Sequence, residues 1–343
     1  MATRSAFEVV AVTHVIARAG LQPAMYTRAS LHAEDRLWPE KNCYIDVWIG
    51  LTHGLGLDPL AMMSFLVACD FEGDQWTFYK PQHSELADLY GFDVQELTVW
   101  KTLLEHTVEH LGAGKVISTE SDAFYLPDTS GTDYKRNHVK TTIVLVEVDT
   151  VAERCAYFHN TGLHWMEGED YRQIFRVGVP HDPTFLPLFA EVVRLDRLVQ
   201  YDRATLQTMA TALLRRYTAK RPVQNPITRF GQRFAEELPI LHGKGLAHYH
   251  AWAFATTRQM GSAFELLSLH LAWLADGAPA GRSTALLEAS AAFADISAGA
   301  KAFILKAARA VNGKKPLDVS EQFSQWAQAW ERAMAAITVA LAS

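Results

Sequence analysis

The sequence predicts an α+β protein in which a mixed first half, residues 1–180, precedes an all-helical second half, residues 181–343. The β-branched run 138–149 is the clearest strand pattern, and segment 154–160 would return beside it as a hairpin. Beyond residue 182 the chain becomes alanine-rich with helical periodicity, and strand patterns stop. We therefore place the domain boundary near residues 179–183.

The composition is that of a globular protein with about two domains. Hydrophobic residues make up 49% of the chain and charged residues 20%. The net charge of −6 does not favour binding to a nucleic-acid backbone. The odd cysteine count of 3 indicates a reducing compartment. Because residues 1–20 lack a signal-peptide pattern and no long apolar span follows, we expect a cytoplasmic protein without membrane segments.

The elements of the first half follow from local periodicity, breakers and caps. A strand or short helix comes first, then two helices separated by Asp58 and Pro59, an aromatic strand, two further helices and two short strands. A short helix closes the domain after the hairpin. In chain order, the predicted ranges are 7–17, 42–53, 59–68, the second part of 70–81, 84–90, 93–111, 115–118, 122–126, 138–149, 154–160 and 169–175.

The second half reads as helices only, with no fixed-period repeat, so we expect a bundle rather than a solenoid. A dimerisation surface on this half, giving a homodimer, stays open as an alternative to a ligand-binding role. The predicted helices are 185–195, 203–218, 226–238, 248–276, 285–311 and 319–342.

Cys43 stands where the first long helix should begin. The apolar residues that follow it lie nearly all round the first turns, which predicts a buried helix with a rigidly held start. The unsatisfied N–H groups of a helix N-terminus stabilise a thiolate, so Cys43 is a candidate nucleophile. A small buried apolar residue is the alternative interpretation.

Histidines in the predicted hairpin could serve that thiol. His138 opens the first strand, and His159 and Asn160 end the second. A hairpin places the start of one strand beside the end of its partner, so we expect His138 and Asn160 to be cross-strand neighbours. Cysteine would attack, His138 would move the proton, and Asn160 rather than His159 would hold the imidazole.

These motifs resemble a known fold. Cys43 at a helix start, the strand from His138 and the segments 157–162 and 169–175 resemble the papain-like cysteine fold, closest to bacteriocin-processing peptidases and the N-terminal domain of the butirosin acyltransferase. With segment 71–78 they also resemble an uncharacterised bacterial family associated with amino acid:carrier protein ligases. The chain departs from the peptidases where their oxyanion glutamine and their Asp-Pro pair would stand.

The resemblance implies acyl transfer more than proteolysis. The donor would be an aminoacyl carrier protein or aminoacyl-tRNA, and the acceptor a small molecule or protein in natural-product biosynthesis. No cofactor is implied, apart from the phosphopantetheine that belongs to a donor carrier protein. A cysteine hydrolase or peptidase of the same fold, or a non-catalytic module that binds a carrier protein, remain the alternatives.

Four further residues are candidates for substrate binding. Asn42 would help the Cys43 N–H to stabilise an oxyanion. Glu120 and Asp122, at spacing two before the hairpin, would face an aminoacyl ammonium group, and Lys140 would share the face of His138. Ordinary solvated positions are the alternative for the three charged residues.

A metal enzyme is the rival class. His106 and His110 stand four apart on a predicted helix, a spacing that allows both imidazoles to bind one zinc. The complete His-Glu-x-x-His pattern is absent and no third ligand is indicated, so we predict no metal site.

Overall fold

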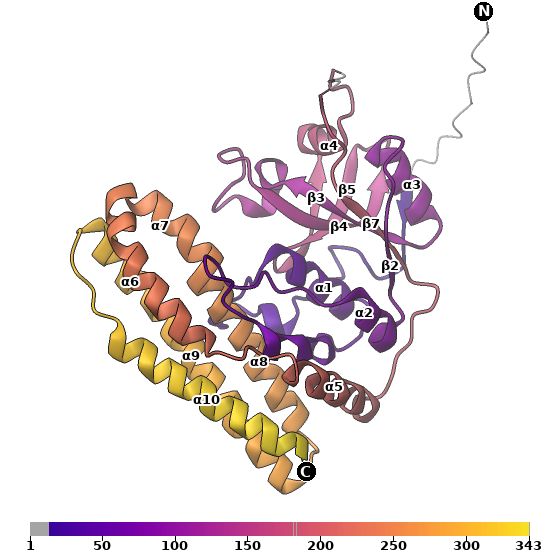
Figure 1. Ribbon diagram of the computed structural model, residues 1–343. Helices are drawn as coiled ribbons and strands as arrows, with labels where there is room; N and C mark the ends of the chain where they lie inside the picture. Colours follow the sequence, from indigo (N-terminus) through magenta and orange to yellow (C-terminus); the bar gives the residue numbers. More distant parts are fainter. Residues whose placement is uncertain (1–13, 181, 183, 343) are drawn as a thin grey trace, which may run out of the picture. The chain divides into compact units, whose positions relative to one another are not determined.

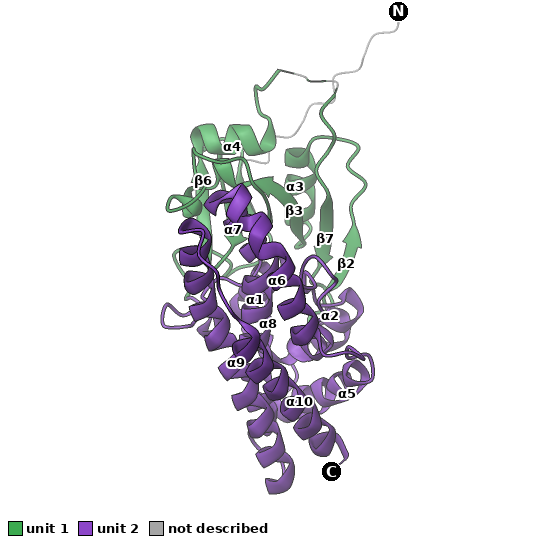
Figure 2. Ribbon diagram, turned by 60° about the vertical axis from the view of Figure 1, so that its left-hand side comes forward, with its two compact units in different colours: residues 1–27, 92–198 green, residues 28–91, 199–343 purple. Residues whose placement is uncertain are grey.

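The computed structural model describes residues 14–180, 182 and 184–342, and the chain forms two compact units (Figures 1 and 2). Unit 1 takes the chain up to residue 27 together with 92–198, and unit 2 takes 28–91 together with the chain from 199 onward. Residues 28–91 therefore group with the helices of the second half, whereas the predicted division at residue 180 passes through unit 1.

Unit 1 is built on an antiparallel sheet, and two helices cover parts of it (Figure 1). Among the described residues the sheet has seven strands in the order β2-β7-β3-β4-β5-β6, with β1 also pairing β4. Helix α3 packs on β3 and β4, and α4 on β5 and β6. The bounds are β1 His14–Ile16, β2 Asp93–Glu96, α3 Leu103–Gly112, β3 Val116–Asp122, β4 Lys140–Asp149, β5 Arg154–His159, β6 Gly162–Glu167, α4 Gly168–Phe175 and β7 Ala190–Arg194, with 3-10 turns at Ala123–Tyr125 and Pro127–Thr129.

The predicted hairpin is the centre of this sheet. Strand β4 is buried over most of its length, with Ile143 to Val146 fully enclosed, as its β-branched sequence requires. It pairs antiparallel with β5, and the register shifts between Leu145 and Glu147. An extra residue there increases the local twist of the strand.

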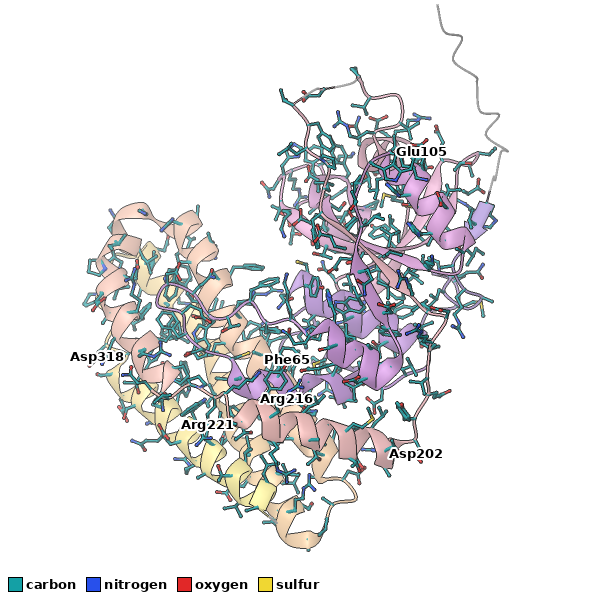
Figure 3. The ribbon with its side chains drawn as sticks, turned by 45° about the vertical axis from the view of Figure 1, so that its right-hand side comes forward. Phe65, Glu105, Asp202, Arg216, Arg221 and Asp318 are labelled. Carbon is teal, nitrogen blue, oxygen red and sulfur yellow. The ribbon has the colours of Figure 1, made fainter. Side chains whose placement is uncertain are left out.

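Several predictions for unit 1 were wrong. Helix 93–111 is instead strand β2 followed by α3, which begins at the capping box of Thr102 and Glu105. Glu105 is labelled in Figure 3. Of the strands expected at 115–118 and 122–126, the first falls in β3, which continues to Asp122, and the second is instead the 3-10 turn Ala123–Tyr125. The helix expected at 185–195 contains strand β7, which pairs with both β2 and β3. Strand β6 was not predicted, and the part of segment 7–17 before residue 14 lies outside the described residues.

Unit 2 is helical. Helices α8, α9 and α10 pack successively on one another. The short 3-10 helix η1 and then α1 come first along the chain of this unit. The predicted stop of one helix at residue 238 was wrong because α6 continues through Pro239. The bounds are η1 Ser30–His32, α1 Cys43–Gly54, η2 Pro59–Ala68, α2 His83–Tyr90, α5 Arg203–Thr218, α6 Pro226–Lys244, α7 Leu246–Ala253, a π-helix at Phe254–Arg258, α8 Gln259–Ala275, α9 Ala280–Asn312 and α10 Ser320–Ala342.

The apolar segment η2 ties the first part of unit 2 to the second. Met62, Met63 and Leu66 are fully buried, and η2 packs against both α5 and α8. The ring centroid of Phe65 lies 6.4 Å from that of Tyr217 on α5. Tyr217 follows Arg216, which is labelled with Phe65 in Figure 3. The predicted α+β class with a helical second part is confirmed at this level. Among the described residues, no helix is both long and apolar enough to cross a bilayer.

Candidate functional site

Cys43 is the first residue of α1, as the sequence predicts. Its predecessor Asn42 is extended, and its side-chain oxygen accepts hydrogen bonds from the N–H groups of Tyr44 and Ile45 at 3.1 and 3.0 Å. The Asn42 amide nitrogen donates to the carbonyl of Tyr79 at 3.2 Å. Both ends of this carboxamide are thus used in fixing the helix start. The buried residues of α1 run from Tyr44 to Thr52, while Cys43 itself is only partly buried.

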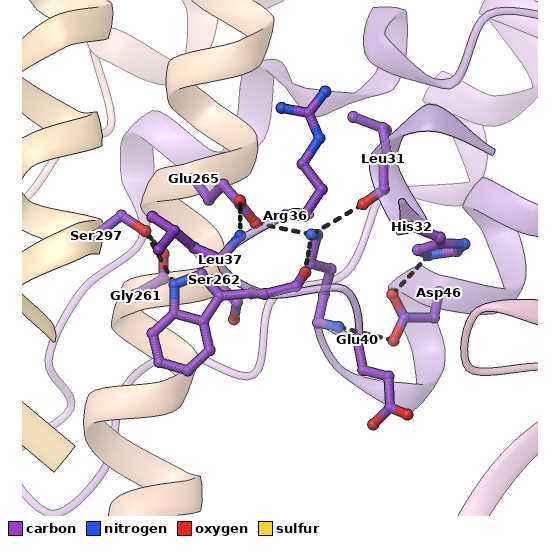
Figure 4. A network of polar contacts seen from close by, with 12 residues as sticks. Leu31, His32, Arg36, Leu37, Glu40, Asp46, Gly261, Ser262, Glu265 and Ser297 are labelled. Atoms are coloured by element: carbon purple, nitrogen blue, oxygen red, sulfur yellow. Dashed lines mark hydrogen bonds and ion pairs between the residues drawn. The ribbon is translucent and has the colours of Figure 1, made fainter. Parts of the chain in front are cut away.

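A buried charged network fixes the chain just before Cys43 (Figure 4). The Lys41 ammonium group donates to Glu265 on α8 at 2.8 Å, to the carbonyl of Leu31 at 3.0 Å, and to the carbonyl of Trp38. Its backbone N–H donates to Asp46, whose other oxygen contacts His32 at 3.0 Å. Burial lowers the pKa of Lys41, and the carboxylate of Glu265 opposes that shift.

This network fixes the backbone that leads to Cys43. A fully buried ammonium group has to keep its partners, because leaving a charge unpaired in the interior costs several kcal/mol. The backbone from Trp38 to Asn42 is therefore held against α8, and the Trp38 indole N–H adds a 2.9 Å hydrogen bond to Ser297 on α9. The chain that enters α1 at Cys43 is therefore held by tertiary contacts with α8 and α9.

In unit 1, His138 is oriented by a carboxylate. Its Nδ1 lies 2.6 Å from Asp122, and its ring stacks on Phe124 with centroids 4.3 Å apart and planes 8° from parallel. The side chain is 66% exposed. An imidazole held through Nδ1 by a carboxylate presents Nε2 outward, which is the arrangement that general-base catalysis uses.

The charged residues predicted around His138 do lie together. Asp122 and Lys140 are directly opposite each other on β3 and β4, and the Lys140 ammonium lies 3.0 Å from Glu120. His138 itself lies two residues before β4 rather than opening it. Each predicted acidic residue thus has a basic partner inside unit 1: Asp122 contacts the His138 imidazole, and Glu120 contacts the Lys140 ammonium.

His159 has a different setting, because both of its ring nitrogens have partners. Nδ1 contacts Asp128 at 2.7 Å and Nε2 contacts the hydroxyl of Thr141 at 2.7 Å. Asp128 also accepts a 2.6 Å hydrogen bond from Tyr157, and His159 is 2% exposed. Burial raises the pKa of Asp128, but the hydrogen bond and charge of His159 outweigh burial and leave that pKa below its usual range.

No sequence pattern indicates this buried cluster of Asp128, Thr141 and His159. Asp128 belongs to a turn-rich segment with Pro127, which reads as a loop, and no pattern connects it to a histidine 31 residues away. Because the His159 imidazole is enclosed on both sides, its geometry favours a structural role over proton transfer to a substrate.

The expected pairing of His138 with Asn160 was wrong. Strands β4 and β5 pair Val144 with Phe158, and His159 already pairs with Gly162 on β6. Asn160 therefore lies in the tight turn between β5 and β6, where its φ is +46°. Asparagine is favoured in such left-handed turn positions, so the sequence signal at residue 160 reports a turn.

The histidines of the rival metal hypothesis stack on each other. The rings of His106 and His110 are 6.1 Å apart and nearly parallel on α3, and burial lowers the pKa of both. Within residues 14–180, 182 and 184–342, no group of three His, Cys, Asp or Glu side chains is arranged to hold a metal ion.

Comparison with known proteins shows a two-part family. The model of the DUF1839 N-terminal domain matches residues 27–195, and that of the DUF1839 C-terminal domain matches residues 203–339. The junction of the two models falls at the passage from unit 1 to unit 2 near residue 198. No curated protein matches the chain. The two matches together span most of the sequence, and the chain belongs to the DUF1839 family.

Proposed function

We propose that the protein is a thiol-dependent acyltransferase in which Cys43 carries the acyl group. The observation that supports this proposal most is the placement of Cys43 as the first residue of a buried helix, with the chain before it locked by Asn42 and the Lys41 network. A cysteine fixed in this way meets the positive end of the helix dipole, which favours the thiolate.

The base is the imidazole of His138, with Asp122 as the residue that orients it. Among the predicted imidazoles, His138 is exposed and held through one nitrogen, whereas His159 is enclosed through both. Cys43 belongs to unit 2 and His138 to unit 1, so each role is assigned on the geometry inside its own unit.

The reaction has two steps. His138 first takes the proton of Cys43, and the thiolate attacks the carbonyl carbon of an aminoacyl thioester or ester. The bond to the donor sulfur or oxygen breaks, and the donor leaves with the proton that His138 returns. His138 then takes the proton of an acceptor amine or hydroxyl, the new bond to the acyl carbon forms, and the Cys43 thiolate is released. Aminoacyl carrier protein and aminoacyl-tRNA are the proposed donors, a small molecule or protein is the proposed acceptor, and the cytoplasm is the proposed location.

The same chemistry supports a papain-like relationship for this chain. A helix-borne cysteine followed along the chain by an imidazole beside an antiparallel hairpin is what that resemblance implies. A cysteine hydrolase would use the same groups with water as acceptor. A module that only binds a carrier protein would use neither group.

The test follows the loss of aminoacyl thioester from a panel of loaded carrier proteins mixed with candidate amine acceptors. Native protein should consume the thioester and form an acylated acceptor, and Cys43→Ala should not. His138→Gln should slow turnover by about 10²-fold or more, as loss of a general base does. His248→Gln, a change of the same kind at an exposed histidine outside these clusters, is the matched control.

The outcomes separate the three alternatives. Release of free amino acid instead of an acylated acceptor identifies a hydrolase. Binding of the loaded carrier without turnover, unchanged in Cys43→Ala, identifies a binding module. Turnover that survives Cys43→Ala overturns the thiol mechanism.

A further inference from the structure

At one end of the unit 1 sheet, where several strands begin or end, charged residues lie together that the proposed acyl transfer does not use. Strand β7 pairs Val193 with Val116 of β3 and Arg194 with Asp93 of β2. Residue 17, just after β1, donates its N–H to Val146 of β4, which places the end of β1 beside the start of β3. The ends of β1 and β7 and the starts of β2 and β3 therefore lie close together.

The segments at these strand ends enclose a cavity of about 660 Å³ with a cationic lining. Four of its lining side chains are cations, namely Arg18, Lys115, Arg194 and Arg197, and two are carboxylates, Asp93 and Asp196. The cavity thus carries an excess of positive charge, although the whole chain has a net charge of −6.

Three of the four cations keep their charge available. Arg194 is paired with Asp93 at 2.7 Å. The hydrogen bonds from Gln95 and from Arg194, together with the charges of Arg194 and Arg197, hold the pKa of Asp93 below its usual range. Arg18, Lys115 and Arg197 form no ion pair with any described residue. Cations that converge on one cavity without protein partners repel each other, and an anion placed among them removes that repulsion.

We propose that this cavity binds a small phosphorylated molecule through its phosphate group. Guanidinium groups match phosphate oxygens with paired hydrogen bonds, and a lysine adds a compact charge. The volume is in the range of pockets that enclose small ligands. A nucleic-acid backbone would instead require a basic surface extended along its length, which the acidic balance of the chain opposes.

This site is independent of Cys43 and of the proposed acyl transfer. Isothermal titration calorimetry measures binding of pyrophosphate, inorganic phosphate and adenosine monophosphate to the full chain at low salt, and again at high salt. The variants are Arg18→Gln, Lys115→Gln and Arg197→Gln. Arg309→Gln, an exposed arginine on α9 that does not line the cavity, is the matched control.

Native protein should bind at least one phosphate probe, with affinity falling as salt rises. Each lining variant should bind the probe at least about tenfold more weakly than native protein, as expected when a charged hydrogen bond is lost. Arg309→Gln should bind like native protein. Unfolding temperatures without ligand should be unchanged, since the altered side chains have no ion-pair partners.

Absence of binding to all three probes at millimolar concentration would overturn the proposal, as would an equal loss in Arg309→Gln. Binding confined to a single-stranded RNA oligonucleotide, added as a further arm, would also overturn it and would reassign this end of the sheet to nucleic acid. Binding of adenosine monophosphate but not of inorganic phosphate would support the proposal and show that the rest of the ligand contributes.

Discussion

At the scale of single residues, the three cysteines have contrasting settings. Cys43 is partly buried at a helix start, whereas Cys69 and Cys155 are enclosed in their cores. Burial raises the pKa of the Cys69 and Cys155 thiols, and neighbouring carboxylates add to the shift. Only the thiolate reacts as a nucleophile, so burial makes the Cys69 and Cys155 thiols poor nucleophiles at neutral pH.

We therefore expect iodoacetamide to alkylate Cys43 first in the native protein at neutral pH. Peptide mass mapping after brief labelling should find the carbamidomethyl group on Cys43, with Cys69 and Cys155 modified only after unfolding in urea. Labelling of either buried cysteine at the same rate as Cys43 would contradict this picture.

The enclosed carboxylate of Asp128 gives a second prediction at this scale. Because its pKa is lowered in the folded state, its charge stabilises the protein above the unfolded pKa of about 4, and that contribution is lost as the pH falls through the lower folded value. Asp128→Asn should lower the free energy of unfolding by about 3 kcal/mol at neutral pH.

The difference between native and Asp128→Asn protein should shrink in acid, where Asp128 is protonated and the two side chains are both neutral. Urea titrations at neutral pH and at successively lower pH measure this directly. A difference that stays constant into acid would show that shape, not charge, explains the effect.

At the scale of elements, the close approach of Trp38 to α8 fixes the segment that leads to Cys43. An ideal Cβ built on Gly261 would lie 2.8 Å from Cε2 of Trp38 and 3.1 Å from Cβ of Ala300. Ser297 completes the contact, since its hydroxyl donates to the carbonyl of Gly261 at 2.7 Å. Glycine at residue 261 is therefore required by packing.

Gly261→Ala should destabilise the protein by about 2 kcal/mol through overpacking. Gly243→Ala is the matched control, because it also lies in a helix and nothing approaches its ideal Cβ within 4 Å. There the gain in helix propensity should leave stability unchanged or raise it by up to about 1 kcal/mol. Thermal unfolding of both variants measures the contrast, and equal effects would contradict the packing argument.

Elements with a strong local signal could be predicted from the sequence. Helix α1, the pair β4 and β5, and several helices of unit 2 have clear periodicity, breakers or caps and appear within a few residues of their predicted bounds. Strands β2 and β7 could not be predicted, since each is short and is defined by pairing with the other. Here tertiary pairing outweighs local propensity.

The candidate site shows the same limit. His138 and Asp122 could be identified as polar residues near the hairpin, but their contact depends on the register of β3 against β4. Asp128 and Thr141 join His159 from separate segments, and no spacing rule connects the three. Asn160 was misassigned because asparagine serves both catalytic sites and left-handed turns.

At the scale of the whole molecule, the division of the chain predicts how fragments behave. Residues 28–91 include η2, whose buried apolar side chains are covered by α5 and α8 from the second half of the chain. A fragment that ends at residue 198 would expose this surface.

We expect the fragment 1–198 to aggregate or to bind the dye ANS strongly, because it leaves a contiguous apolar face uncovered. Co-expression with the fragment 199–343 should restore a folded complex with the ANS fluorescence of the intact chain. Cooperative unfolding of fragment 1–198 alone, without ANS binding, would show that the first half folds independently.

Intact-protein mass spectrometry shows directly whether Cys43 carries an acyl group, as we propose. Native protein mixed with aminoacyl carrier proteins, and separately with aminoacyl-tRNA, should gain the mass of one aminoacyl group, and Cys43→Ala should gain none. Hydroxylamine should remove the adduct, as it does from a thioester. An adduct that persists in Cys43→Ala, or no adduct with any donor while the donors stay intact, would contradict the account.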